Sequence, residues 1–199
     1  MVENQPADGR ERNKRATRQA LRTATLELAL ERGIDAVTID EIARRAGVST
    51  RTFFNYFDTK EDAALLELFL VSDEELEGFA VATGSDVWAE LTEIFTTDVR
   101  HAEQLDAANL LRYLQLHARH PELGAHQMGR FAMFLDRLND AITKRLGNRS
   151  RLRAEVMAGS CITAVRVGLD QWHARNGKSS AATYVAAAFG EFDGAFGDR

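Results

Sequence analysis

The chain has 199 residues, of which 45% are hydrophobic and 28% are charged, and its net charge is −5. This length is sufficient for one large or two small globular units with a buried core. No run approaches the roughly 18 uninterrupted apolar residues of a membrane-spanning helix, and Met1 to Asn13 lack the apolar segment of a secretion signal. The single cysteine, Cys161, excludes an internal disulfide. We therefore expect a cytoplasmic protein without a membrane segment.

The charge is unevenly distributed along the chain. Residues 10–60 hold 11 Lys and Arg against 7 Asp and Glu, whereas residues 61–199 hold 14 against 21. A basic head on an acidic body is typical of a phosphate-facing module carried by a soluble protein.

Two prolines and the absence of alternating strand patterns predict an all-α fold of about nine helices. Residues 1–11 are predicted to be a disordered tail. A first helix is expected over residues 13–32, where alanine and leucine recur at helical spacing. Gly33 is placed to take a positive φ after its last turn.

A second helix is predicted to begin at Thr38, where Glu41 completes a capping box. It ends at Gly47, and Ser49 caps a short third helix over residues 49–57. Three helices are thus packed into about 50 residues.

A second capping box, Thr59 with Asp62, predicts a longer fourth helix that continues through Leu70. We place the boundary between a head, residues 12–60, and a body, residues 61–199, near residue 60. Further helices are expected over residues 86–100, 104–119, 121–146, 151–175 and 180–196.

Residues 38–57 meet the requirements of a helix-turn-helix. Two helices that cross steeply through a short turn need a residue that tolerates positive φ, and Gly47 does so. Ala43 keeps the first helix thin where the second crosses it. Apolar residues fill the corner from both sides: Ile42, Ala46, Val48, Phe53 and Tyr56. An ordinary helical hairpin does not need all these features together, so we interpret the segment as a helix-turn-helix.

The stretch from Ala16 to Leu68 resembles the TetR/AcrR family of bacterial regulators, most densely over residues 47–62. The shared pattern is a glycine-valine-serine turn, an aromatic-rich recognition helix, a tyrosine-phenylalanine pair and a lysine-glutamate pair that opens the fourth helix. The resemblance implies a three-helix DNA-binding head on a helical body that binds an effector and dimerises. Two positions depart from the family pattern: Arg51 is usually small, and Phe54 is usually tyrosine.

The third helix is then expected to lie in the major groove of operator DNA. Arg51 either forks onto a guanine or contacts a phosphate. Phe53, Tyr56 and Phe57 have an alternative interpretation as core residues, and the basic run over residues 10–22 is either a DNA-contacting arm or a tail. The predicted DNA contacts are Thr38, Ser49, Thr50, Arg51, Thr52, Phe54, Asn55, Tyr56 and Lys60.

Aromatic and leucine residues of the middle helices are candidates for an effector pocket, although such stripes more often form core. The predicted lining is Phe95, Leu110, Tyr113, Leu114, Phe131 and Phe134. Residues 110–123 are similar to a mycofactocin-regulator-like subgroup associated with acyl-CoA effectors. A small, largely apolar effector is therefore expected, with an acyl-CoA as one candidate.

The last two predicted helices suit a dimer seam, with an intramolecular core as the alternative. The predicted seam residues are Val165, Leu169, Trp172, Phe189 and Phe192.

The sequence offers little chemistry beyond binding. His117 and His120 lack a clear third ligand, so we expect no metal and no cofactor. Phosphate loops, nucleophile elbows and paired-carboxylate motifs are missing, so we do not expect an enzyme. The overall expectation is a homodimeric repressor that binds a near-palindromic operator and is released by its effector. The alternatives are a ligand-independent activator of the same fold, or a helical effector-binding protein or enzyme with a structural helix-turn-helix.

Overall fold

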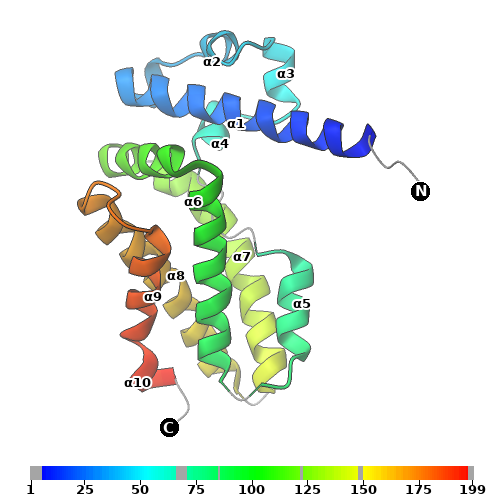
Figure 1. Cartoon of the computed structure of the whole chain (residues 1–199), viewed down its shortest axis with the longest axis vertical. Coiled ribbons are helices and arrows are strands. Elements are labelled where there is room, and N and C mark those ends of the chain that lie inside the picture. Colours follow the sequence, from blue (N-terminus) through cyan, green and yellow to red (C-terminus); the bar gives the residue numbers. More distant parts are fainter. Residues whose placement is uncertain (1–5, 66–70, 85, 122, 148–149, 197–199) are drawn as a thin grey trace. The chain divides into compact units, whose positions relative to one another are not determined.

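The computed structural model describes residues 6–65, 71–84, 86–121, 123–147 and 150–196, which form α-helices and one 3₁₀ turn without a strand (Figure 1). The expected all-α class is confirmed. None of the described helices combines the length and apolar character needed to cross a membrane.

The chain divides into two compact units. The head unit comprises Met1–Leu66 together with Gln115–His126, and the body unit comprises Glu67–Leu114 and Gln127–Arg199. The predicted boundary near residue 60 lies inside the head unit, and sequence reasoning did not anticipate the returning segment.

The head unit is built around α1, which packs against η1, α2 and α4, while α2 packs against α3. Its core is a cluster of leucine, alanine and aromatic side chains that includes Leu21, Ile42 and Phe53. The elements are α1 (Pro6–Arg32), η1 (Ile34–Ala36), α2 (Ile39–Arg45), α3 (Thr50–Phe54) and α4 (Lys60–Ala64).

Helix α1 begins earlier than predicted. Its first residue is Pro6, so the predicted disordered tail is wrong for residues 6–11, while residues 1–5 lie outside the described part. Proline fits the first turn of a helix because its missing N–H has no partner there in any case. The polar composition that suggested a tail is equally compatible with an exposed helical turn.

Two other head helices end earlier than predicted. Helix α3 stops at Phe54 because Asn55 and Tyr56 donate to carbonyls three residues back, at 3.1 and 2.9 Å, which tightens the last turn. Helix α4 stops at Ala64. Leu65 has an extended backbone and a buried side chain, so tertiary packing overrides the helical periodicity here. Residues 66–70 of the predicted fourth helix lie outside the described residues.

The body unit is a helical bundle in which α8 packs against α9 (Figure 1). A buried aromatic cluster joins α6 to the last helices, where the Trp88 and Phe189 rings lie 5.2 Å apart. The elements are α5 (Asp73–Val81), α6 (Val87–Arg119), α7 (Leu123–Leu146), α8 (Arg151–Ala174), α9 (Ala181–Gly190) and α10 (Asp193–Phe196).

The body helices differ from the prediction in three places. Helix α5 was not predicted, although Ser72 and Glu75 form its capping box. The two helices expected over 86–100 and 104–119 are one element, interrupted at Asp106 (φ −165°, ψ 77°). The Asp106 carboxylate accepts the Asn109 N–H at 3.0 Å and so restarts the helix as an internal cap. The helix expected over 180–196 is divided after Gly190.

Candidate DNA interface and effector cavity

The entrance to α2 is fixed by a reciprocal cap. The Thr38 hydroxyl accepts the Glu41 N–H at 3.3 Å, and the Glu41 carboxylate accepts the Thr38 N–H at 3.0 Å. Arg32 of α1 donates to the same carboxylate at 3.1 Å. The backbone hydrogen bond from Thr38, assisted by Arg32, lowers the pKa of Glu41 to about 2, so this cap stays ionised at neutral pH. The predicted capping box is confirmed.

The turn after α2 is a Schellman motif, which needs the glycine. The Gly47 N–H donates to the Arg44 carbonyl at 3.2 Å, and the Val48 N–H donates to the Ala43 carbonyl at 2.9 Å. Gly47 has φ +71°, a conformation that strains any residue with a Cβ. The positive φ expected at Gly47 is confirmed, and it sets the direction in which α3 leaves.

Helix α3 is oriented by its first residues. Ser49 Oγ accepts the Thr52 N–H at 3.1 Å, which caps the helix. The Thr50 hydroxyl donates to the Asp40 carboxylate of α2 at 2.6 Å. Phe53 is completely buried in the head core. These contacts fix which side of α3 faces inward.

The outward face of α3 is formed by Arg51, Phe54 and Asn55, which are exposed and share one side of the helix through their spacing of three and four residues. Phe54 is 53% exposed, which is unusual for a large aromatic side chain. Arg51 makes no hydrogen bond or ion pair within the described part of the chain. This face is therefore available to a partner.

Lys60 and Tyr56 are more constrained than the sequence suggested. The Lys60 ammonium donates to the Asp35 and Val37 carbonyls at 3.2 and 3.0 Å, so it anchors α4 to η1. Tyr56 is half-buried against the head core. Its carbonyl accepts a hydrogen bond from Arg18, whose guanidinium also lies 4.7 Å from the centre of the Phe57 ring. The sequence gave no signal for this supporting role of Arg18.

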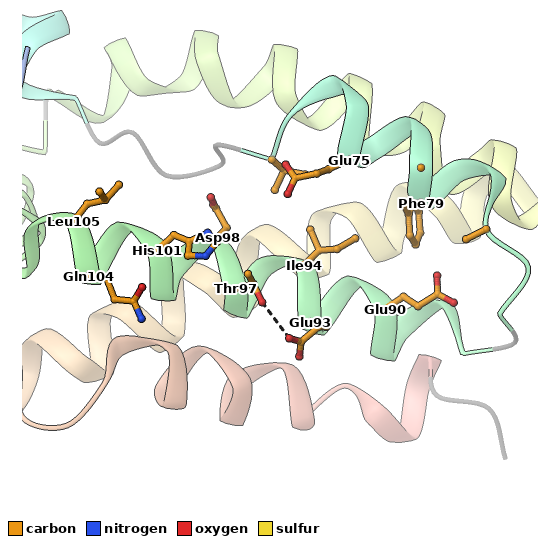
Figure 2. Close-up of a pocket in the computed structure, with 13 residues that line it drawn as sticks. Glu75, Phe79, Glu90, Glu93, Ile94, Thr97, Asp98, His101, Gln104 and Leu105 are labelled. Atoms are coloured by element: carbon orange, nitrogen blue, oxygen red, sulfur yellow. Dashed lines mark hydrogen bonds between the residues drawn. The ribbon is translucent and has the colours of Figure 1, made fainter. Parts of the chain in front are cut away.

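The body unit contains a cavity of about 770 Å³ between α5 and α6 (Figure 2). Apolar side chains including Phe79 and Ile94 contribute part of its wall. The charged lining residues are Glu75, Glu90, Glu93 and Asp98.

None of the six predicted pocket residues lines this cavity. Phe95 packs against Phe189 and Phe134, with ring centres 5.8 and 6.1 Å away. Leu110, Tyr113 and Phe134 are buried, and Leu114 and Phe131 are half-buried. The cavity lies on another face of α6, at Ile94, Thr97 and Asp98. A search for apolar stripes misses it because half of that face is polar.

Most of the predicted dimer-seam residues are core of a single chain. Val165, Leu169, Trp172 and Phe189 are all buried within the body unit, which corrects the prediction. The reason is the close packing of α9 onto α8 along these side chains. Phe192 is half-buried, with its ring 5.7 Å from that of Trp88.

A separate face of α8 is open. It carries the exposed apolar residues Leu152, Val156 and Val167, of which Leu152 is 75% exposed. A Cβ built on Gly159 of the same helix would meet no atom within 4 Å.

The remaining candidate residues show no catalytic or metal-binding arrangement. Among the described residues, no three His, Cys, Asp or Glu side chains are grouped as a metal site. Burial lowers the pKa of His117 to about 4, so this imidazole is neutral at pH 7. Burial raises the pKa of the Cys161 thiol, so it is inert core as the sequence indicated.

A helix-turn-helix with an exposed α3 face, joined to a helical body, defines a DNA-binding transcription regulator. Residues 21–65 match the model of the tetR family of bacterial regulatory proteins, and residues 85–196 match the MftR C-terminal domain. The chain belongs to the TetR family.

Two named relatives support this assignment. The regulator TcmR of Streptomyces glaucescens is 29% identical over 144 residues, which are 69% of this chain and 64% of TcmR. YdeS of Bacillus subtilis (strain 168), a transcriptional regulator of the helix-turn-helix type, is 42% identical over 62 residues, 31% of this chain and 30% of YdeS. The matches span less than two thirds of the length of either relative.

Solved structures share the fold. The fatty acid degradation regulator FadR from Bacillus halodurans matches with a TM-score of 0.56 and 19% identity, covering 92% of this chain and 97% of FadR. A TetR-family transcriptional regulator from Mesorhizobium loti MAFF303099 matches with a TM-score of 0.51 and 18% identity, with the same coverage.

Proposed function

We propose that this protein is a homodimeric repressor that binds a near-palindromic operator and is released by a small amphipathic effector. The observation that carries the proposal is the exposed face of α3, where Arg51, Phe54 and Asn55 stand together on a helix whose other side is fixed in the core. A dimer would place two such helices in successive major grooves, about 34 Å apart.

The contacts divide into base-reading and positioning groups. Arg51 and Asn55 reach base edges, and Phe54 packs against a thymine methyl or a sugar. Ser49, Thr52 and Thr38, at the starts of α2 and α3, contact the phosphate backbone. Thr50, Tyr56 and Lys60 act mainly by holding the motif together, since each is engaged within the head.

The proposed dimer seam is the open face of α8. Leu152 and Val156 are four residues apart, and Val167 continues the exposed apolar surface three turns further on. Gly159 lies between them and allows a second helix to approach closely. Burying these side chains against their copies would remove exposed apolar area from water, which favours association.

The seam is tested by Val156→Arg, with Val81→Arg as the control because Val81 is an exposed valine on α5. Val156→Arg should convert the dimer to a monomer in sedimentation experiments and lower operator affinity sharply. Val81→Arg should leave both unchanged. A Val156→Arg protein that stays dimeric would contradict the proposed seam.

Helix α6 provides a route from effector to DNA. Its residues 90–105 include much of the cavity wall, whereas residues 115–119 of the same helix belong to the head unit. Within that unit, a Cβ built on Gly33 would lie 3.6 Å from His120 Cε1, so the returning segment closely approaches the end of α1. An effector that favours one arrangement of α6 would shift operator affinity by its differential affinity for the two arrangements.

The effector should be amphipathic, because the cavity has both apolar and charged walls. An acyl-CoA would bring several phosphate charges toward four carboxylates. We therefore favour an effector that lacks this anionic group.

A further inference from the structure

We infer that the cavity between α5 and α6 binds an amphipathic organic cation, an apolar or aromatic body that carries a positive charge. The inference rests on the proposed effector-responsive function and assigns a chemical class to its ligand. Three features of the cavity support it: its apolar wall, the sign of its charges and the way those charges are held.

The apolar wall sets the body of the ligand. Val71, Phe79, Ile94 and Leu105 line the cavity, and its volume of about 770 Å³ is within the range of drug-sized binding sites. Leu105 is largely exposed in the absence of a ligand. An apolar ligand body would cover it and gain free energy from the buried area.

The charged lining has a single sign. Four carboxylates line the cavity, and the described lining includes no Lys or Arg. Glu90 is the one whose positive partner is evident, since Arg145 Nη2 lies 2.8 Å from its carboxylate. A desolvated anion in this cavity would be repelled, whereas a cation would form charge-assisted contacts.

The carboxylates are held in place rather than freely mobile. The Ser72 N–H donates to Glu75 at 2.7 Å, and this bond lowers the pKa of Glu75 and keeps it ionised. The Thr97 hydroxyl donates to Glu93 at 3.1 Å. Asp98 is only 8% exposed, which places a carboxylate within the protein wall. Prearranged charges of this kind favour a cation without a large ordering cost.

The Arg145 clamp gives the cavity a rigid end. The Arg145 guanidinium donates to the Ala82 and Gly84 carbonyls and to Glu90, so it ties α7 to both helices that border the cavity. Its carbon centre lies 5.9 Å from the centre of the Phe79 ring. That ring therefore already borders a positive charge, as cation–π contacts allow.

The experiment compares two probes of the same shape and opposite charge, tetraphenylphosphonium and tetraphenylborate, by titration calorimetry on the full-length protein. The inference predicts phosphonium binding at least about tenfold tighter than borate binding. Glu93→Gln and Asp98→Asn should each weaken phosphonium binding several-fold. Glu77→Gln is the matched control, because Glu77 is an exposed carboxylate of α5 outside the cavity lining.

Equal or tighter borate binding would overturn the inference. So would unchanged phosphonium affinity in Glu93→Gln, an exposed position where the substitution preserves shape and folding. Asp98→Asn is interpreted only if its thermal unfolding matches that of the wild type, and unchanged affinity in the folded variant would also overturn the inference.

A second measurement separates this inference from the proposed function. Operator affinity is measured with and without saturating phosphonium. Cation-selective binding that leaves operator affinity unchanged supports the assigned ligand class and contradicts ligand-controlled release. Operator binding by a protein that shows no preference for the cation contradicts the ligand class alone.

Discussion

The hydroxyl of Thr50 donates a 2.6 Å hydrogen bond to the carboxylate of Asp40, joining the first residue of α3 to the second residue of α2. The bond closes the helix-turn-helix on the side opposite Gly47. It links the two helices directly, in addition to their apolar corner, and so helps to fix the angle at which α3 is presented.

Replacing Thr50 with valine removes this hydrogen bond while keeping the side-chain shape. We expect the free energy of unfolding to fall by about 1 kcal/mol, because the bond involves a charged acceptor at a partly exposed site. Operator affinity should fall as well, since α3 is less well held. Thr183→Val, at an exposed position of α9, is the control in chemical denaturation. Unchanged stability and operator affinity in Thr50→Val would show that the bond does not set the motif.

Arg51→Ala should relax the preference for one base pair in each half-site. A bidentate contact to guanine contributes about 1–3 kcal/mol of discrimination, and Arg51 is exposed beside Asn55 with no competing partner in the described residues. The measurement is affinity for a panel of operators with single base changes. Arg166→Ala on α8 is the control. Equal weakening on every operator would instead identify a phosphate contact.

Gly168→Ala should destabilise the body unit by about 1–3 kcal/mol. A Cβ at position 168 would lie 2.5 Å from Val185 Cα, so the backbones of α8 and α9 would have to separate. Gly159→Ala is the matched control on the same helix, because nothing lies within 4 Å of its Cβ and alanine favours the helix. Thermal unfolding of both variants decides the matter. Equal stability of the two would contradict the close approach.

His117 should make stability depend on pH below neutrality. Burial lowers its folded-state pKa from 6.5 to about 4, so the folded state resists protonation that the unfolded chain accepts. The stability is fully present above pH 6.5 and falls as the pH drops from 6.5 to 4, by up to about 3 kcal/mol.

His117→Gln should flatten the pH dependence of unfolding over this window. His101→Gln, at an exposed site on α6, is the control and should not. A wild-type protein as stable at pH 4.5 as at pH 7 would contradict the predicted linkage.

Local signals in the sequence predicted the head well. The capping boxes at Thr38 and Thr59, the Ser49 cap and the positive φ of Gly47 each depend on neighbours within a few residues, and the structure confirms all four. Helix α5 was missed although Ser72 and Glu75 carry the same signal, because its apolar periodicity is weak.

The body could not be predicted at the level of faces. Trp172 and Leu169 lie in the core because α9 packs onto that side of α8, a relationship that depends on residues far apart in the chain. The cavity was missed for a related reason, since its wall combines apolar and acidic residues from α5 and α6. Periodicity identifies an apolar stripe but not which neighbouring element covers it.

The most direct test of the central claim is a salt titration of binding to the DNA upstream of the protein's own gene, with unrelated DNA of equal length alongside. A regulator that inserts α3 into the major groove should bind the upstream DNA more tightly, and log K should fall steeply with log salt because phosphate contacts release counterions. A slope near zero, or equal affinity for both DNAs at every salt concentration, would contradict the assignment of α3 as an operator-reading helix.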